Sequence, residues 1–144
     1  MDQTTAIQSD DNTIEILQFD HIQMDVADLE ENIIFYKSIF GFEIKEMGVR
    51  AMTRWAILGN RHKLYLCMHE NLAGKGKKNE GLVITHFGLI VTDFDNVLSK
   101  LKARNVSLAY DFEVQYHSSK SVYFFDPNGY KIEISERIGG GIDR

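Results

Sequence analysis

A nine-residue pattern occurs twice in this chain and constrains its fold more than any other feature. Residues 20–28 (DHIQMDVAD) align with residues 85–93 (THFGLIVTD). In both copies apolar residues alternate around a histidine, and the segment ends at an aspartate. Alternation with a period of two predicts a half-buried strand, and aspartate is a favourable N-cap for a helix. We therefore expect a strand that leads into a helix at two places in the chain.

Each copy is followed by the same series of expected elements. An apolar stripe at helical spacing follows Asp28, another follows Asp93, and Gly41 is a natural stop for the first helix. Three strands are expected after each helix, at residues 42–47, 53–58 and 63–69, and again at 107–114, 120–125 and 130–136. This order predicts an α+β fold of two βαβββ modules, whose curved sheets are each covered by a helix on one face and enclose a cup with the other.

The two modules account for nearly the whole chain. We expect a single domain over residues 14–138, with modules at about 14–70 and 82–138. Residues 1–13 are polar and acidic and predict a flexible leader, and residues 139–144 predict a flexible tail.

Composition narrows the range of partners. Sixteen Lys and Arg residues against 21 Asp and Glu residues give a net charge of −5, which argues against a nucleic-acid groove or an anionic membrane surface as the partner. No apolar stretch approaches the roughly 18 residues that a transmembrane helix needs, and the N-terminus lacks the pattern of a signal peptide. The single cysteine, Cys67, cannot form an internal disulfide, so a cytoplasmic setting is expected.

Strand alternation places three potential metal ligands on the open face of the cup. His21 and His86 alternate with the apolar residues expected under the helices, and Glu133 has the same position in the last strand. Two imidazoles and one carboxylate form a facial triad suited to Fe(II), Mn(II), Ni(II) or Zn(II). A single His or Glu on a strand is more often a partly exposed polar residue, but the equivalence of His21 and His86 in the two copies favours a shared role.

Together these segments resemble the vicinal-oxygen-chelate superfamily, which includes glyoxalase I, extradiol dioxygenases, fosfomycin-resistance enzymes and bleomycin-binding proteins. The segments that carry the resemblance are residues 20–22 (DHI), 35–36 (FY), 41–42 (GF), 85–87 (THF) and 121–133 (SVYFFDPNGYKIE). In this family a histidine on the first strand of each module and a glutamate on the final strand bind the metal. The resemblance thus implies that His21, His86 and Glu133 hold one divalent ion, and that a small oxygen-bearing substrate chelates it.

The extradiol dioxygenases are the leading specific interpretation. They bind Fe(II), and their signature has a histidine, an aliphatic-Tyr pair and an acidic residue followed by Pro, Gly and the ligand Glu. This chain has His117, Tyr123 and Glu133 in that order, with the gap after His117 one residue short. The resemblance implies that Tyr123 hydrogen-bonds a substrate oxygen, that His117 acts as acid or base, and that His69 is a second acid–base histidine. Fe2+ is then the favoured metal. Otherwise, Tyr123 is an aromatic residue of the cup wall and His117 an exposed loop residue.

Two other enzyme classes are alternatives, with Mn2+, Ni2+ or Zn2+ as the metal. Glyoxalase I uses a fourth ligand, a Glu in the first module, where this chain has Tyr65. Fosfomycin-resistance thiol transferases use the three-ligand set, but they usually extend further beyond the final Glu and tend to have a Lys near the position of Glu113. The third alternative is a metal-independent small-molecule binding protein.

The resemblance also implies a homodimer, because cups in this family are often completed across a subunit interface. His21 and Glu133 would then meet across two chains. A ligand histidine normally donates its second N–H to a fixed acceptor, for which Gln23, Ser135 and the backbone are candidates.

Overall fold

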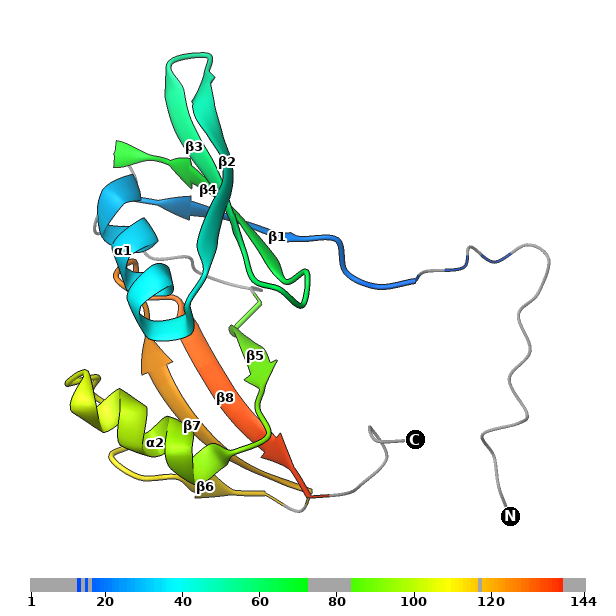
Figure 1. The fold of residues 1–144 in the computed structure, drawn as a ribbon, viewed down its shortest axis with the longest axis vertical. Coiled ribbons are helices and arrows are strands. Elements are labelled where there is room, and N and C mark those ends of the chain that lie inside the picture. The colour runs from blue at the N-terminus through cyan, green and yellow to red at the C-terminus, as the bar shows by residue number, and fades with distance from the viewer. Residues whose placement is uncertain (1–12, 14, 16, 73–83, 117, 139–144) are drawn as a thin grey trace.

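The computed structural model describes Thr13, Glu15 and residues 17–72, 84–116 and 118–138 (Figure 1). Apart from Thr13, the predicted leader lies outside the described residues, and so does the predicted tail.

The described elements follow the predicted order, a strand, a helix and three strands, twice. The first module consists of β1 (Ile22–Val26), α1 (Leu29–Phe40), β2 (Glu43–Arg50), β3 (Thr53–Gly59) and β4 (Tyr65–Glu70). The second module consists of β5 (His86–Ile90), α2 (Phe94–Ala103), β6 (Val114–Gln115), β7 (Ser119–Phe125) and β8 (Lys131–Arg137). The predicted α+β fold of two βαβββ modules is confirmed.

Each module forms a four-stranded sheet with the same topology. The strand orders are β1-β4-β3-β2 and β5-β8-β7-β6. The first strand of each module runs parallel to the last strand, whereas the other neighbours are antiparallel. Figure 1 shows the two modules stacked along the long axis, with both helices on one side of the molecule. Each histidine-bearing segment therefore lies beside the closing strand of its own module.

Local sequence signals determine where both helices begin. The Asp28 side chain accepts a hydrogen bond from the N–H of Glu31 at 3.0 Å, and the Asp93 side chain accepts one from the N–H of Asn96 at 3.2 Å. Gly41 ends α1 in the left-handed conformation, with φ of 69°. A residue without Cβ adopts this conformation without strain, which explains the stop at this position.

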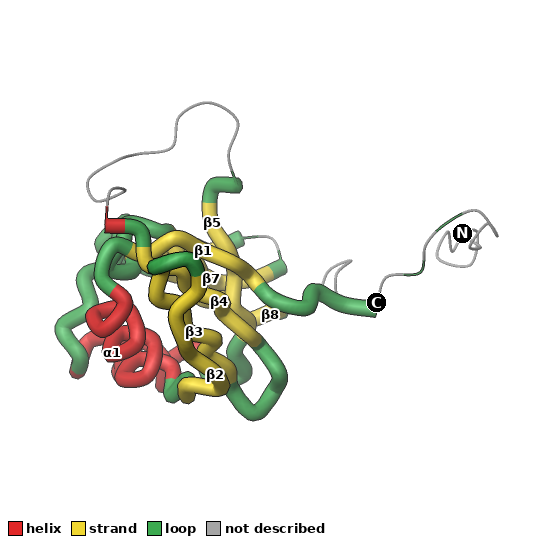
Figure 2. Tube along the Cα trace, turned by 90° about the horizontal axis from the view of Figure 1, so that it is seen from above, coloured by secondary structure: helices red, strands yellow, loops and turns green. Residues whose placement is uncertain are grey.

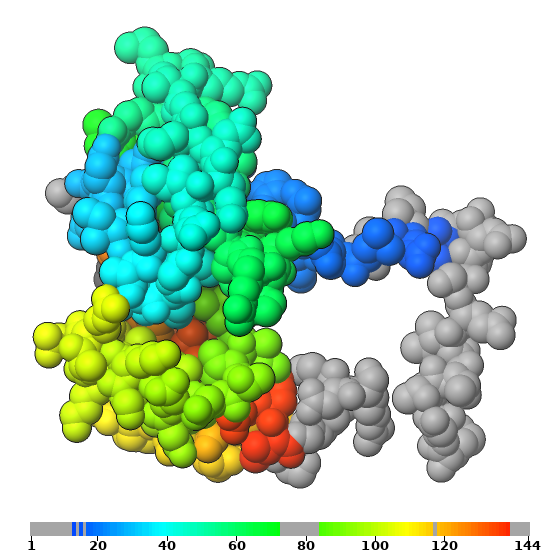
Figure 3. All heavy atoms as spheres, viewed as in Figure 1, coloured from blue at the N-terminus to red at the C-terminus, as the bar shows by residue number. Residues whose placement is uncertain are grey.

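One apolar core joins the two modules. It includes Met24 and Val26 of β1 and Ile132 and Ile134 of β8, all buried as strand alternation predicts. The space-filling view shows the atoms of the two modules in direct contact (Figure 3). Seen from above, α1 packs along one face of the first sheet (Figure 2). Burial of each large apolar side chain contributes about 1.5–3 kcal/mol to folding, so this shared core favours a fixed arrangement of the modules.

A polar junction also connects α1 to the turn between β7 and β8. The hydroxyl of Tyr36 donates to Asp126 Oδ2 at 2.8 Å, and both side chains are buried. The amides of Asn32 and Asn128 donate to each other, and Asn128 Oδ1 also accepts from the N–H of Ala27. These groups satisfy one another at a buried or partly buried position, which makes the junction specific.

One predicted strand is wrong in its extent. Residues 107–114 were expected to be extended, but only Val114–Gln115 pair with β7. The preceding residues 109–112 form turns and bends, and Asp111 has a positive φ of 62°. Aspartate tolerates this left-handed conformation, which interrupts an extended segment. The bend also brings the ring of Tyr110 to within 5.2 Å of the Tyr123 ring.

Candidate metal centre

The structure brings two of the three predicted metal ligands together. His86 and Glu133 lie on the adjacent parallel strands β5 and β8, and His86 Nε2 is 3.2 Å from Glu133 Oε2. Gly88 is the register partner of Glu133, and a Cβ at this position would lie 3.3 Å from Oε2. Because Gly88 has no side chain, the carboxylate of Glu133 has room beside it. The imidazole of His86 and this carboxylate thus lie next to each other, and both are groups that bind metals in proteins.

Tyr123 holds this carboxylate from the other side. Its hydroxyl donates to Glu133 Oε1 at 2.7 Å, and its ring packs edge-on against His86. Burial raises the pKa of Tyr123, and its hydrogen bonds with Tyr116 and Glu133 raise it further. The Tyr123 hydroxyl therefore remains a proton donor at neutral pH.

Glu133 is ionised in this environment. Burial alone would raise the pKa of Glu133, but hydrogen bonds from Tyr123, Ser121 and His86 outweigh it and hold this pKa below the ordinary value. Metal ligands must be deprotonated, so the group is in the form that a cation needs.

Tyr116 extends the chain of hydroxyl groups. Its hydroxyl is 2.6 Å from that of Tyr123, so the hydrogen bonds run from Tyr116 through Tyr123 to Glu133. Tyr116 was not among the predicted site residues, although it directly precedes His117 in the sequence.

His21 lies in the first module, just before β1, beside a hollow of about 290 Å³. The hollow is lined by Asp20, His21, Lys45, Glu46, Ile57, Tyr65 and Cys67. The side chain of His21 is 45% exposed. Burial raises the pKa of the Cys67 thiol, which disfavours the nucleophilic thiolate.

The two histidines share the same anchoring arrangement. His21 Nδ1 is 2.7 Å from Asp20 Oδ2, and His86 Nδ1 is 2.9 Å from Thr85 Oγ1. In each case the residue just before the histidine contacts Nδ1, which is how histidines that bind metals are commonly oriented. The other ring nitrogen of His86, Nε2, faces Glu133. The anchors are therefore not Gln23 or Ser135. The equivalent positions of Asp20 and Thr85 in the repeat are the sequence signal that could have found them.

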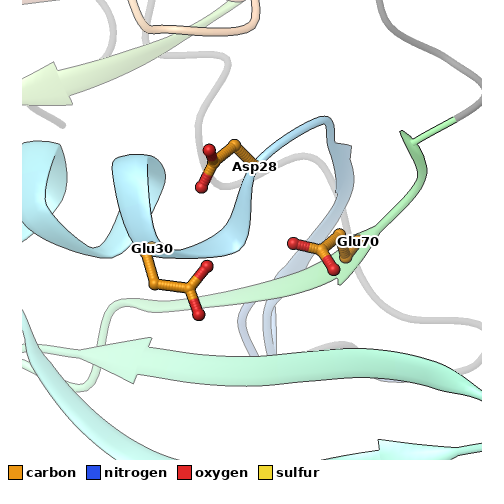
Figure 4. Close-up of side chains that lie close together, drawn as sticks. All are labelled: Asp28, Glu30 and Glu70. Atoms are coloured by element: carbon orange, nitrogen blue, oxygen red, sulfur yellow. The ribbon is translucent and has the colours of Figure 1, made fainter.

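Within one chain, His21 does not join the other two predicted ligands. In the described part of the molecule, one set of three His, Cys, Asp or Glu side chains has donor atoms within 4.8 Å of one another, and it consists of Asp28, Glu30 and Glu70 (Figure 4). The set of His21, His86 and Glu133 does not meet this criterion.

The acidic group in Figure 4 already has partners. Arg54 donates to Glu30 and Glu70, and Glu70 Oε2 also accepts from the N–H of Leu29. Hydrogen bonds from Arg54 lower the pKa of both glutamates. Asp28 is the N-cap of α1. These carboxylates therefore stabilise the start of α1 and the end of β4.

Two further histidines, His69 and His117, are predicted to act in acid–base catalysis. His69 lies on β4, two residues beyond Cys67, and it is not among the residues that line the hollow. His117 lies outside the described residues. Their catalytic roles stay predictions.

The helices of the described residues are all too short or too polar to cross a membrane.

A match to a family sequence model places the protein in a known class. The chain belongs to the Glyoxalase/Bleomycin resistance protein/Dioxygenase superfamily, whose sequence model matches residues 18–134. The family resemblance inferred from the sequence is thereby confirmed.

Two metallothiol transferases, both called FosB, are similar in sequence. The protein from Staphylococcus epidermidis is 27% identical over 121 residues, which cover 84% of this chain and 82% of the relative. The protein from Lysinibacillus sphaericus is 26% identical over 121 residues, which cover 82% of this chain and 81% of the relative.

Solved structures share the fold at lower identity. A glyoxalase/bleomycin resistance protein/dioxygenase domain from Frankia has a TM-score of 0.76 at 15% identity, covering 88% of this chain and 96% of its own. Another similar structure is a variant of the fosfomycin resistance protein FosX from Listeria monocytogenes, in complex with Mn(II) and 1S,2S-dihydroxypropylphosphonic acid. It has a TM-score of 0.66 at 20% identity, and the match covers 90% of this chain and 98% of the FosX chain.

Proposed function

We propose that this protein is a divalent-metal-dependent enzyme that transfers a thiol to a small, oxygen-bearing substrate. The observation that carries the proposal is the common anchoring of His21 and His86, each through Nδ1, with a carboxylate placed beside one of them. The similarity to two metallothiol transferases supports thiol transfer over the dioxygenase interpretation.

In this proposal His21, His86 and Glu133 hold the metal. Two imidazoles and one carboxylate leave coordination positions open for substrate oxygens. When bound, the metal supplies Lewis-acid polarisation of a substrate oxygen. Mn2+ is the first metal to test, because the similar FosX structure contains Mn(II).

The residues around the ligands have distinct tasks. Tyr123 holds Oε1 of Glu133, which leaves Oε2 directed toward His86 Nε2 and the metal position. Asp20 and Thr85 hold the imidazole rings in place. This support preorganises the donor atoms, so little free energy is spent on ordering them when the metal binds.

The third ligand comes from a second copy of the chain in this proposal. His21 lies on the open face of the first module and is accessible to a partner. A homodimer would complete two identical sites, each with His21 from one chain and with His86 and Glu133 from the other.

The experiment compares the wild type with Glu133→Gln. Metal-free protein is titrated with Mn2+, Ni2+, Zn2+ and, without oxygen, Fe2+, and loss of free thiol is then followed with fosfomycin as the trial substrate. We expect about one ion per chain in the wild type and a loss of affinity of more than about tenfold in Glu133→Gln. Glu136→Gln is the matched control, because Glu136 lies on the same strand and accepts from the N–H of Phe94, a contact that Gln preserves.

Other outcomes would change the proposal. Equal metal affinity in the two proteins would exclude Glu133 as a ligand. Metal binding with oxygen uptake on catechol-like compounds, and no thiol consumption, would favour the dioxygenase. No metal binding by the wild type would leave a small-molecule binding protein.

A further inference from the structure

A lysine lies on the open face of the second module, next to the proposed ligands. Lys131 is two residues before Glu133 on β8, so alternation places both side chains on the same face of the sheet. The parallel register pairs Lys131 with His86 of β5. A positively charged group therefore adjoins the half-site that the structure assembles.

Aromatic side chains hold this ammonium group in position. Lys131 Nζ is 5.7 Å from the centre of the Tyr110 ring and 5.8 Å from that of the Tyr123 ring. It also donates to the Tyr110 hydroxyl at 3.1 Å. Cation–π contacts and one hydrogen bond orient the ammonium without neutralising it.

No carboxylate of the described residues forms an ion pair with Lys131. The ion pairs found among the described residues involve other cations, and none includes Lys131. Lys120 provides the contrast, since its Nζ lies 5.2 Å from the Phe94 ring and also 3.9 Å from carboxylate oxygens of Asp95 and Glu136. Both lysines contact aromatic rings, but Lys120 is also paired with acidic groups and Lys131 is not.

Electrostatics favours an anion at this position. A divalent cation bound by two imidazoles and one carboxylate would retain a net positive charge, and Lys131 would add another beside it. Tyr110 can also offer its hydroxyl to a ligand, because the side chain is partly exposed at the rim. Although the protein has a net charge of −5, this position carries a local positive charge and therefore favours an anionic ligand.

We propose that Lys131 and Tyr110 form an oxyanion-binding subsite, which holds a phosphonate, phosphate or carboxylate group of the substrate. The neighbouring oxygens of the same substrate then reach the metal position at His86 and Glu133. The inference rests on the proposed function for the role of the bound group, but anion binding by Lys131 can be measured without any turnover.

The test measures binding of methylphosphonate and of inorganic phosphate to the Mn2+-loaded protein by isothermal titration calorimetry. Replacement of a charge-assisted hydrogen bond should weaken anion binding about tenfold or more in Lys131→Met, with the Mn2+ affinity unchanged within about twofold. Lys131→Arg keeps the charge and should retain most of the affinity. Lys120→Met is the matched control and should bind both anions as the wild type does. A parallel titration with acetate identifies the preferred oxyanion.

The proposed oxyanion subsite and the proposed metal site can be tested independently of each other. If the wild type binds no divalent ion, phosphate is titrated into the metal-free protein and followed by NMR. Shifts that disappear in Lys131→Met but persist in Lys120→Met then still support the subsite. Anion affinities that are equal in the wild type and Lys131→Met, or a wild type that binds neither anion, overturn the inference.

Discussion

At the scale of single residues, Glu70 connects three elements at the end of β4. Arg54 of β3 donates to its carboxylate, and so does the N–H of Leu29 in the first turn of α1. The hydrogen bond from Arg54 is the largest cause of the lowered pKa of Glu70, followed by the bond from Leu29. A carboxylate near a helix N-terminus also interacts favourably with the helix dipole.

We predict that Glu70→Gln lowers stability in a pH-dependent way. The folded-state pKa of Glu70 lies below the unfolded value, so its contribution is present above an unfolded pKa of about 4.3 and is lost as pH falls through the folded pKa. Urea unfolding of both proteins at pH 7 and at pH 3 measures the difference. The variant should be less stable at pH 7 by a margin that shrinks at pH 3, and a constant margin would contradict the charge-based explanation. Glu43→Gln, which changes a more exposed carboxylate, is the control.

The proposed ligands could be predicted from the sequence more readily than the groups around them. His21 and His86 stand out because they recur at equivalent positions, and a repeat is visible without a structure. Lys131 and Tyr110 were missed because their contact depends on the bend at residues 109–112, which the apolar pattern did not indicate. Side-chain contacts of this kind arise from loop geometry and are not encoded in spacing.

At the scale of elements, the turn between β2 and β3 departs from ordinary residue preferences. Ala51 and Met52 have φ of 50° and 64°, and Arg50 pairs with Thr53 on either side of them. Two positive φ values in a two-residue hairpin loop define a type I′ turn, for which Asn-Gly is strongly preferred. The hairpin thus forms despite its turn residues, because the flanking strands are paired.

The double variant Ala51→Asn/Met52→Gly should be more stable than the wild type by about 1 kcal/mol, because it relieves this backbone strain. Urea unfolding with a shared slope measures the gain. Met52→Ala is the control, since it removes the exposed side chain but keeps the unfavourable φ. A gain in Met52→Ala equal to that of the double variant would assign the effect to side-chain exposure instead.

The junction between α1 and the β7–β8 turn gives a second prediction at this scale. Tyr36→Phe removes the hydroxyl that donates to buried Asp126 and should cost about 1–2 kcal/mol in unfolding free energy. Tyr130→Phe serves as the control, because the Tyr130 hydroxyl makes an exposed hydrogen bond to the Asp25 carbonyl and should matter less. Equal losses in the two variants would show that burial of the Tyr36–Asp126 contact is not what makes it important.

At the scale of the whole molecule, the sequence predicted two modules but not how their open faces meet. Apolar alternation specifies which face of each sheet is buried under a helix, as Met24 and Ile134 show. It does not specify which surface covers the opposite face. In the described residues His86 lies beside Glu133 in the second module, and His21 lines the hollow of the first module.

In the proposed homodimer, isologous pairing would complete the metal site. In a twofold-symmetric dimer, a contact from one chain to the other is repeated in reverse, so His21 of each copy could reach the His86–Glu133 pair of its partner. Two equivalent sites would then form from surfaces that one chain leaves apart. Metal affinity and dimerisation should accordingly depend on each other, because binding between chains favours the associated state.

Complementation between inactive variants tests this arrangement. His21→Ala and Glu133→Ala should each bind metal poorly and lack activity, because every site in either homodimer misses one ligand. A dimer with one copy of each variant has one intact site, formed by His21 of the Glu133→Ala chain and by His86 and Glu133 of the His21→Ala chain. Random pairing after co-expression should therefore restore about one quarter of the wild-type sites. Purification through two different affinity tags should raise this to about one half, since only mixed dimers remain. If all three ligands instead came from one chain, the mixed dimer would regain neither metal binding nor activity, even where light scattering shows that it has formed.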